Sequence, residues 1–311
     1  MLRLLEHHSY NREAIKALLE TALADTPLLR GGPRQTPSVL LKPNFVMPAP
    51  RSDASTTHPE LYMAIAELLL ARGFRVGIGE SPAFGSCARA LAAHGVLEEC
   101  LALGISVVEF RQPRAHAGVE DDRRFRRLTV AAELGQWDTI VNLPKVKTHQ
   151  QFTFTGATKN LYGCVVGKRK FIRHNLCGND PVRFARMIIA TAAQTACSLH
   201  IGDGIEAMHV RGPRGGQSYP LGRLIVADDN LEHDWLLCRL IGLAPEDTPL
   251  FRALDQGERD ALRATTESIT TAEGFQAARD FRHAPLVHIS FSPWAIARSG
   301  YRTIRYRLQG H

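Results

Sequence analysis

The sequence lacks the features of membrane-spanning, secreted and iron–sulfur proteins. Its 311 residues contain no apolar run near the roughly eighteen residues that a membrane-spanning helix needs. The N-terminal stretch MLRLLEHHSYNREAIK has no apolar signal-peptide core. The six cysteines stand far apart without C-x-x-C spacing, which argues against a zinc ribbon, a redox dithiol or an iron–sulfur cluster within this chain. We therefore expect a cytoplasmic protein with reduced thiols and no membrane partner.

Negative charge is missing from one long part of the chain. The net charge is +7, and the segment from Thr139 to Asn179 has no Asp or Glu, where average composition would supply about four. Aromatic residues make up only 7% of the chain and no nucleic-acid-binding motif is present, which argues against a nucleic-acid partner. A pocket for a small anion explains the positive charge at least as well. The sequence leaves open a homo-oligomer or a redox partner protein.

Strand and helix patterns alternate along the chain. Strand patterns occur at 38–46, 75–81, 105–110, 127–134, 138–147, 198–208 and 222–229. Helical patterns occur at 10–29, 58–74, 86–102, 155–165, 182–196 and 230–243. This alternation predicts an α/β fold with a mostly parallel sheet and helices on both faces, in one or two α/β lobes.

The same patterns suggest how the chain is divided. We expect the α/β domain to cover residues 38–255, after an N-terminal helical segment at 1–37. Residues 256–311 form a C-terminal extension with a weaker pattern, in which 285–291 reads as a strand. The charged stretch 111–127 is expected to be a hairpin or a solvated insertion.

The acid-free segment holds the residues that we expect to bind an anion. Lys145, Lys147 and His149 are spaced by two, so their side chains point the same way on an extended strand. In the helix expected after them, Thr155 and Lys159 lie four residues apart on one face, and the first turn would offer free backbone N–H groups. These features predict a cradle for a phosphate or a carboxylate, although the Walker A and dinucleotide-binding patterns are absent.

Other polar residues follow predicted strands, where ligands bind in open α/β sheets. The candidates for substrate binding are Lys42, Asn44, His58, Lys145, Lys147, Thr155, Asn160 and Lys168. The candidates for catalysis are His149, Lys159 and His174, with the two histidines as acid or base. For the basic residues from Lys168 to Arg173, a solvated surface is the alternative.

Acidic residues gather later in the chain. Asp203, Glu206 and His209 could together hold a divalent metal ion that bridges to an anionic substrate. The alternative roles are turn formation for Asp203 and helix capping for Asp229 and Asp234. The cofactor itself stays unknown at this stage.

Seven motifs, in order, resemble those of the family catalogued as domain of unknown function 362. They are LKPNFV (41–46), TTHPEL (56–61), GESP (79–82), NLPKVKTH (142–149), TGATKNLYG (155–163), DGIEAMHVRGP (203–213) and ADDNLEHDWLLCRLIGL (227–243). Glu80 stands where the family usually has aspartate, and His209 where it usually has glutamate. Many members carry ferredoxin-type cysteine clusters, which this chain lacks.

At the level of the fold, this family is also similar to the nickel-pincer lactate racemases, which use a lysine-tethered cofactor and histidines. By that resemblance, Lys159 or Lys168 and His174 would take those parts. We therefore expect an enzyme acting on a small anionic metabolite in a lyase-, isomerase- or reductase-like reaction. The alternative is a non-catalytic binding or assembly protein for an anionic cofactor or a redox partner.

Overall fold

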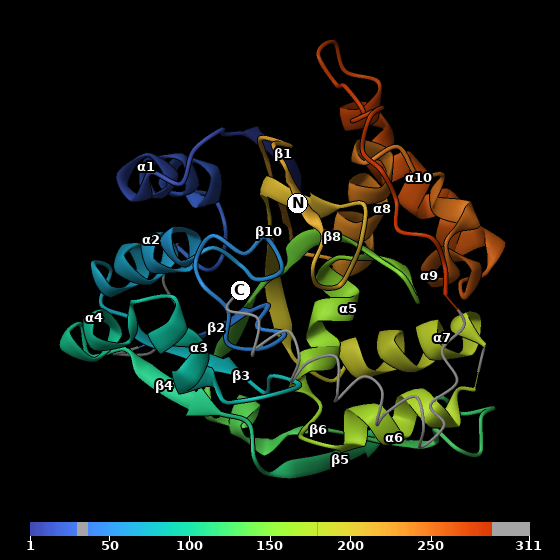
Figure 1. Ribbon diagram of the computed structural model, residues 1–311, viewed down its shortest axis with the longest axis horizontal. Coiled ribbons are helices and arrows are strands. Elements are labelled where there is room, and N and C mark those ends of the chain that lie inside the picture. The colour runs from blue at the N-terminus through green and yellow to red at the C-terminus, as the bar shows by residue number, and fades with distance from the viewer. Residues whose placement is uncertain (30–36, 179, 288–311) are drawn as a thin grey trace.

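A ten-stranded mixed sheet forms the centre of the computed structural model, which describes residues 1–29, 37–178 and 180–287 (Figure 1). The strands in spatial order are β1 (Leu2–Glu6), β12 (Arg223–Ala227), β10 (Cys197–His209), β7 (Thr139–Leu143), β2 (Ser38–Pro43), β3 (Arg75–Glu80) and β4 (Ser106–Glu109). The pairs from β10 to β4 are parallel, and those of β1 and β12 are antiparallel. The predicted α/β fold with a mostly parallel sheet is confirmed.

Shorter strands extend this sheet at one end. They are β8 (Lys145–His149), β9 (Thr153–Thr155) and β11 (Gln217–Tyr219). Strand β8 continues from β7 beyond Pro144 and pairs with the distal part of β10. A separate antiparallel hairpin consists of β5 (Pro113–Ala117) and β6 (Arg127–Ala131), in agreement with the hairpin expected near 111–127.

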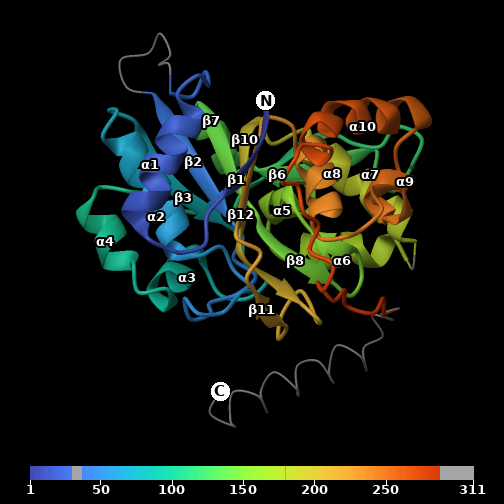
Figure 2. The same ribbon diagram turned by 90° about the horizontal axis from the view of Figure 1, so that it is seen from above.

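Helices cover both faces of the sheet (Figure 2). One face carries α1 (Arg12–Leu23), α2 (Pro59–Leu70), α3 (Cys87–Ala93) and α4 (Leu97–Ala102). The other side carries α5 (Ala157–Leu161), α6 (Arg169–Leu176), α7 (Pro181–Ala192), α8 (Asn230–Leu240), α9 (Pro249–Arg252) and α10 (Gln256–Thr270). Strand β2 is wholly buried, with Val39 and Leu41 in the core under α2 and Leu40 in the core of the opposite face. Such burial on both faces is what a central parallel strand requires.

Some elements differ from the sequence predictions for identifiable reasons. Residues 1–37 carry the strand β1 as well as the expected helix, because Leu2–Glu6, which precede the helical pattern at 10–29, pair with β12. The helix expected at 86–102 is divided into α3 and α4 at Gly95, which has a positive φ of 74°. Residues 285–287 are not a strand, and the rest of the expected strand at 285–291 lies outside the described residues. The domain limits at 38 and 255 stay predictions.

The order of the strands reverses between β2 and β7. From β2 the chain proceeds outward through β3 to β4, and it then returns to add β7 and β10 on the other side of β2. In open α/β sheets, such a reversal leaves a crevice at the carboxyl ends of the two strands, where ligands usually bind. Here that crevice lies beside Pro43 and Leu143, the last residues of β2 and β7.

No helix among the described ranges is long and apolar enough to cross a bilayer. The expected cytoplasmic location therefore stays a prediction.

The N-terminus of α5 is already occupied by a side chain of the protein. The Asp234 carboxylate accepts hydrogen bonds from the backbone N–H groups of Ala157 (2.6 Å) and Thr158 (3.0 Å). The preceding residue is Gly156, where a Cβ atom would lie only 2.1 Å from Asp234 Oδ1. The prediction that this turn offers free N–H groups to an anion is therefore wrong, and helix capping is confirmed as the role of Asp234.

Replacing Asp234 tests this junction. Because Asp234→Ala leaves two buried N–H groups without an acceptor, we expect the free energy of unfolding to fall by about 2–3 kcal/mol, measured by urea denaturation. Asp121→Asn is the control, since it alters an exposed pair with Arg186 and should change stability little. Equal effects of the two substitutions would contradict the capping role.

Candidate functional site

Five buried side chains join the strand ends at the crevice. Lys42 donates to the carboxylate of Glu80 and, at 3.2 Å, to Asn160 Oδ1. The same Oδ1 atom accepts from Asn44 Nδ2 at 2.7 Å. Asn160 Nδ2 in turn donates to Asn142 Oδ1 at 2.8 Å, so that β2, β3, α5 and β7 are linked through side chains. Glu80 neutralises Lys42. The predicted substrate-binding residues Lys42, Asn44 and Asn160, together with Glu80 and Asn142, therefore form a frame for the site.

Gly163 makes room for the charged part of this frame. A Cβ atom at this position would lie 2.5 Å from Lys42 Nζ and 2.6 Å from Glu80 Oε1. Such distances are far below van der Waals contact, so a larger residue would displace the buried ion pair.

Lys147 is buried, and none of the residues that the structure describes gives it an acidic partner. Its Nζ atom donates to Asn44 Oδ1 at 2.7 Å and to the Ser55 carbonyl at 2.6 Å. Burial lowers the pKa of Lys147 well below 10.5, and the charge of Lys159 lowers it further. Thr155 lies opposite Lys147 in the β8–β9 ladder. The buried hydroxyls of Ser55 and Thr155 have no hydrogen-bond partner within the described residues, so each leaves a hydrogen bond open to a ligand.

Lys159 is a lysine of the site for which the described residues provide no partner. Its side chain is partly exposed, and no hydrogen bond or ion pair joins it to any residue that the structure describes. Burial and, secondarily, the charge of Lys170 lower the pKa of Lys159 to about 8. After burial, the charge of Lys159 is the next cause that lowers the pKa values of Lys147, His149 and His174. Lys159 therefore lies electrostatically at the centre of these groups.

Both candidate histidines are uncharged at neutral pH. His149 is buried, and its Nδ1 atom accepts a hydrogen bond from the Gln151 backbone N–H at 3.1 Å, which leaves the proton on Nε2. Burial lowers the pKa of His149 well below 6.5 and that of His174 to about 4. The His174 ring packs against Phe184 with 4.6 Å between centroids.

Lys170 belongs to this group, although we expected a solvated surface as the alternative for its segment. It is half-buried and donates to the Ser81 carbonyl, and burial lowers its pKa to about 8. Arg173 is also buried and donates to the Thr129 carbonyl at 3.1 Å. The surface interpretation is wrong for these two residues. The spacing of 170, 173 and 174 on one helical face was the signal available in the sequence. We call Lys147, His149, Lys159, Lys170 and His174 the basic cluster.

Two other predicted residues lie in a separate group around Asp203. The Asp203 carboxylate accepts from Lys145 Nζ (3.0 Å), Tyr10 Oη (2.7 Å) and the His58 backbone N–H (2.9 Å). The ring of His58 stacks on Tyr10 with centroids 3.6 Å apart. Lys145 is thus neutralised by Asp203, and neither Lys145 nor the His58 backbone is left to hold a substrate anion.

The structure does not bring the three expected metal ligands together. The Asp203 carboxylate is occupied by Lys145 and Tyr10. Glu206 is exposed and accepts a hydrogen bond from Ser218 Oγ at 2.8 Å. His209 Nδ1 accepts from the Arg282 backbone N–H at 3.4 Å. The part of the chain that the structure describes contains no group of three or more His, Cys, Asp or Glu side chains suited to a metal ion. The divalent metal stays a prediction without a supporting cluster.

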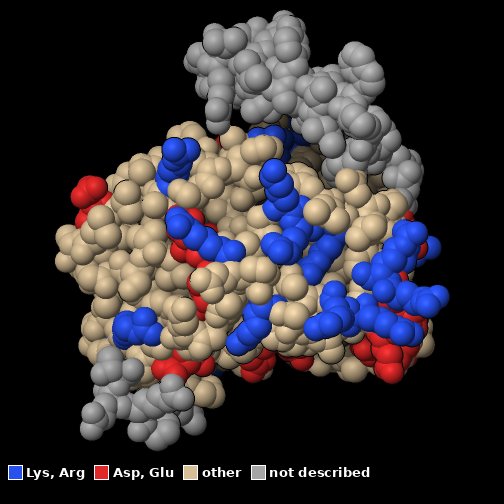
Figure 3. All heavy atoms as spheres, turned by 90° about the horizontal axis from the view of Figure 1, so that it is seen from below, with Lys and Arg blue, Asp and Glu red and all other residues tan. Residues whose placement is uncertain are grey.

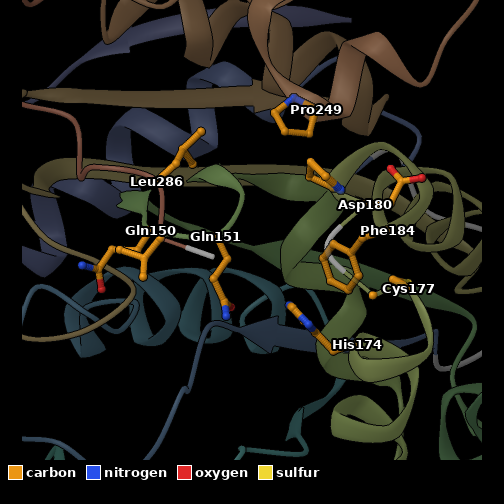
Figure 4. A pocket seen from close by; sticks show the side chains of 11 residues that line it. Gln150, Gln151, His174, Cys177, Asp180, Phe184, Pro249 and Leu286 are labelled. Carbon is orange, nitrogen blue, oxygen red and sulfur yellow. The ribbon is translucent and has the colours of Figure 1, made fainter. Parts of the chain in front are cut away.

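Two cavities open near these residues. A cavity of about 90 Å³ is lined by Gln150, Gln151, His174, Cys177, Gly178, Asp180, Pro181, Phe184, Pro249, Leu286 and Val287. Figure 4 shows His174 and Phe184 on one side of this cavity and Gln151 facing them. A second cavity, of about 360 Å³, has the exposed Lys168 in its wall and lies beyond the ends of β3 and β4.

Comparison with known proteins places the chain among relatives. The protein is 34% identical over 267 residues to the Thylakoid-associated protein sll1697 of Synechocystis sp. (strain ATCC 27184 / PCC 6803 / Kazusa), covering 86% of this chain and 81% of that protein. Among solved structures, the lactate racemase apoprotein from Thermoanaerobacterium thermosaccharolyticum aligns with a TM-score of 0.50 at 11% identity, over 76% of this chain and 56% of that one. A protein from Thermotoga maritima aligns with a TM-score of 0.41 at 16% identity, over 72% and 56%.

The racemase comparison supports the fold alone, because the identity is low and the chain covers little more than half of that protein. The family is established by sequence. The family model described as Domain of unknown function (DUF362) matches residues 39–239, which include the frame and the basic cluster. This match, together with the 34% identity to the Synechocystis protein, shows that the chain belongs to the DUF362 family.

Proposed function

We propose that the protein is an enzyme that binds a small carboxylate or phosphate in the basic cluster and transfers a proton at it, in a lyase-, isomerase- or reductase-like reaction. The observation that carries the proposal is Lys159, which has no partner among the described residues and lies among other bases. No ion pair links Lys147, Lys159 or Lys170 to an acid within the described ranges. An anion would supply the missing negative charge.

The protonation states of the cluster suit acid–base chemistry. With a pKa of about 8, Lys159 is mostly protonated at neutral pH yet loses its proton readily. His149 and His174 are uncharged at neutral pH. His174 can accept a proton, whereas His149 carries its proton on Nε2 and its Nδ1 atom already accepts from the Gln151 N–H. A bound anion would raise all three pKa values, because it favours the charged forms. In this scheme Lys159 holds the anion and donates a proton, and a histidine accepts one.

Other residues of the site would orient the ligand. The unpartnered hydroxyl of Thr155 is placed to hydrogen-bond a ligand beside Lys147, which Asn44 and the Ser55 carbonyl hold in place. His174 lies in the wall of the 90 Å³ cavity, whose apolar side includes Phe184 and Leu286. That cavity is our candidate for the space occupied by the uncharged part of the substrate. The fold shared with a lactate racemase apoprotein makes small carboxylates the first class to test.

The first test replaces Lys159. We expect Lys159→Ala to weaken binding of inorganic phosphate or small carboxylates about tenfold or more in isothermal titration calorimetry, because the anion loses its free cation. Lys16→Ala is the control, since Lys16 of α1 is paired with Glu13 of the same helix and with Glu67 of α2. Unchanged affinity in Lys159→Ala would refute the proposal.

The same variants separate an enzyme from a non-catalytic anion-binding protein. An enzyme should catalyse the exchange of a carbon-bound proton of a bound carboxylate with heavy water, followed by NMR. Lys159→Arg should keep the affinity and lose this exchange, because arginine does not release its proton near neutral pH. Binding without exchange across a panel of carboxylates and phosphate esters would favour the alternative function.

Anion affinity should also depend on pH. Binding requires protonated Lys159, so affinity should fall as the pH rises through about 8. In Lys159→Arg the fall should move to higher pH, since the guanidinium stays charged. Titration calorimetry from pH 6 to pH 10 measures both profiles. A flat profile for the unaltered protein would show that Lys159 does not bind the anion.

Lys159 should reduce the stability of the folded protein. Its pKa is about 8 when folded and 10.5 ordinarily, so the charged form is disfavoured by folding. We expect Lys159→Met to raise the free energy of unfolding by about 1–2 kcal/mol at pH 7. The gain should shrink between pH 8 and 10.5, as the folded unaltered protein loses the proton. A loss of stability would indicate a structural role instead.

A further inference from the structure

Helix α6 is oriented with its basic face inward and its apolar face outward. Arg173 is only 8% exposed, and Lys170 and His174 are half-buried against the body of the protein. By contrast, Phe171 is 41% and Ile172 is 55% exposed. A surface helix of a globular protein normally has the opposite arrangement, with apolar residues toward the core. Among the described residues, nothing packs over this outward apolar face, which calls for a partner.

Neighbouring side chains enlarge this face into a patch. Leu176, one turn along α6, is 38% exposed. Phe84, in the loop after β3, is 55% exposed, and its ring centroid lies 6.4 Å from that of Phe171. Four of the eight large hydrophobic side chains that are exposed in the described part of the chain therefore lie here. Scattered exposed residues are ordinary, but a gathering of this kind marks an interaction site. We call Phe84, Phe171, Ile172 and Leu176 the α6 patch.

Cations without acidic partners lie beside the α6 patch. Lys168 and Arg169 precede Phe171 and are exposed, and the exposed Arg124 donates to the Leu176 carbonyl at 3.1 Å. Arg111 and Lys168 line the 360 Å³ cavity together with Phe171. None of these four cations forms an ion pair with an acid within the described ranges.

The acids of this region are already engaged. Asp121 and Asp122 pair with Arg186 and Arg183, and the Glu109 carboxylate accepts from the backbone at the start of α3. Figure 3 shows the lower face of the molecule, with Lys and Arg spread over its centre and right and Asp and Glu mainly nearer its edges. The α6 patch is apolar, and the cations around it have no acidic partner within the described ranges. This arrangement complements a bilayer surface, which has an apolar interior below negatively charged headgroups.

We propose that the α6 patch docks the protein on the surface of a bilayer rich in anionic lipid. Phe171, Ile172 and Leu176 would enter the region between the headgroups, and Lys168, Arg169 and Arg111 would contact lipid phosphates. Shallow insertion of a helix that lies in the interface needs no spanning segment. The expectation of no membrane partner rested on the lack of such a segment, so it does not bear on this mode of binding.

A membrane fits the α6 patch better than a second protein does. Four partly exposed side chains supply only a few hundred Å² of apolar surface. A stable protein interface buries roughly 1,000 Å² over both partners, so each partner would have to supply about 500 Å². Interfacial binding of a short helix needs less apolar area, because each Lys or Arg near an anionic surface adds about 1 kcal/mol. The 360 Å³ cavity beside Lys168 and Arg111 also offers space for a headgroup.

Vesicle flotation with the full chain tests the proposal. We expect binding to vesicles of phosphatidylcholine mixed equally with phosphatidylglycerol, weakening as salt is raised, and little binding to phosphatidylcholine alone. The double variant Phe171→Ser with Ile172→Ser should reduce binding about tenfold or more. The matched control replaces Leu101 and Leu103 by serine. These residues lie in α4 and at its C-terminal end, away from the α6 patch, and are 54% and 41% exposed.

Several results would overturn membrane docking. The first is that the protein does not bind the anionic vesicles. The second is that the patch variant and its control lose vesicle binding equally. The third is that the protein self-associates with rising concentration and only the patch variant abolishes this. Circular dichroism of each variant shows that it is folded. Lys159→Ala should float like the unaltered protein, so vesicle binding is judged independently of anion binding in the basic cluster.

Discussion

The rest of this structure is constrained by buried lysines. Their ammonium groups are cut off from water at the crevice between β2 and β7. Each must be given hydrogen-bond acceptors or a counter-charge, because a buried charge without them costs several kcal/mol. Lys42 receives the Glu80 carboxylate and Asn160, and Lys147 receives Asn44 and a backbone carbonyl. These acceptors come from different strands and helices, so satisfying the lysines fixes where the elements meet.

Lys159 stands out against that background. Lys42, Lys145 and Lys147 are bound from several sides, whereas no described residue accepts a hydrogen bond from Lys159. The rule that a buried polar group has a hydrogen-bond partner is usually broken at functional sites, where a ligand supplies the missing partner. Ser55, whose carbonyl accepts from Lys147, and Thr155, which pairs with Lys147 in the ladder, have hydroxyls without a partner among the described residues and belong to the same incomplete region. The proposed anion site is thus the place where the otherwise satisfied polar network ends.

Helix α6 connects the two proposals. Its inner face supplies Lys170 and His174 to the basic cluster, and its outer face supplies Phe171 and Ile172 to the α6 patch. A helix of eight residues has little capacity to move one face without the other. A partner that contacts the outer face would therefore also shift Lys170 and His174, because both faces belong to one rigid helix.

The sequence by itself determined the α/β class, the family and most of the residues that meet at the crevice, because periodicity and motif order are local properties. It also singled out Lys159 and the acid-free segment around it. Only the tertiary structure decided which cations are neutralised: Glu80 pairs with Lys42 and Asp203 with Lys145 across separations of 38 and 58 residues. It likewise decided that Asp234 fills the N-terminus of α5 and that α6 faces its lysine inward. These outcomes depend on contacts between distant segments, and the chemistry of a single stretch contains no information about which distant partner will reach it.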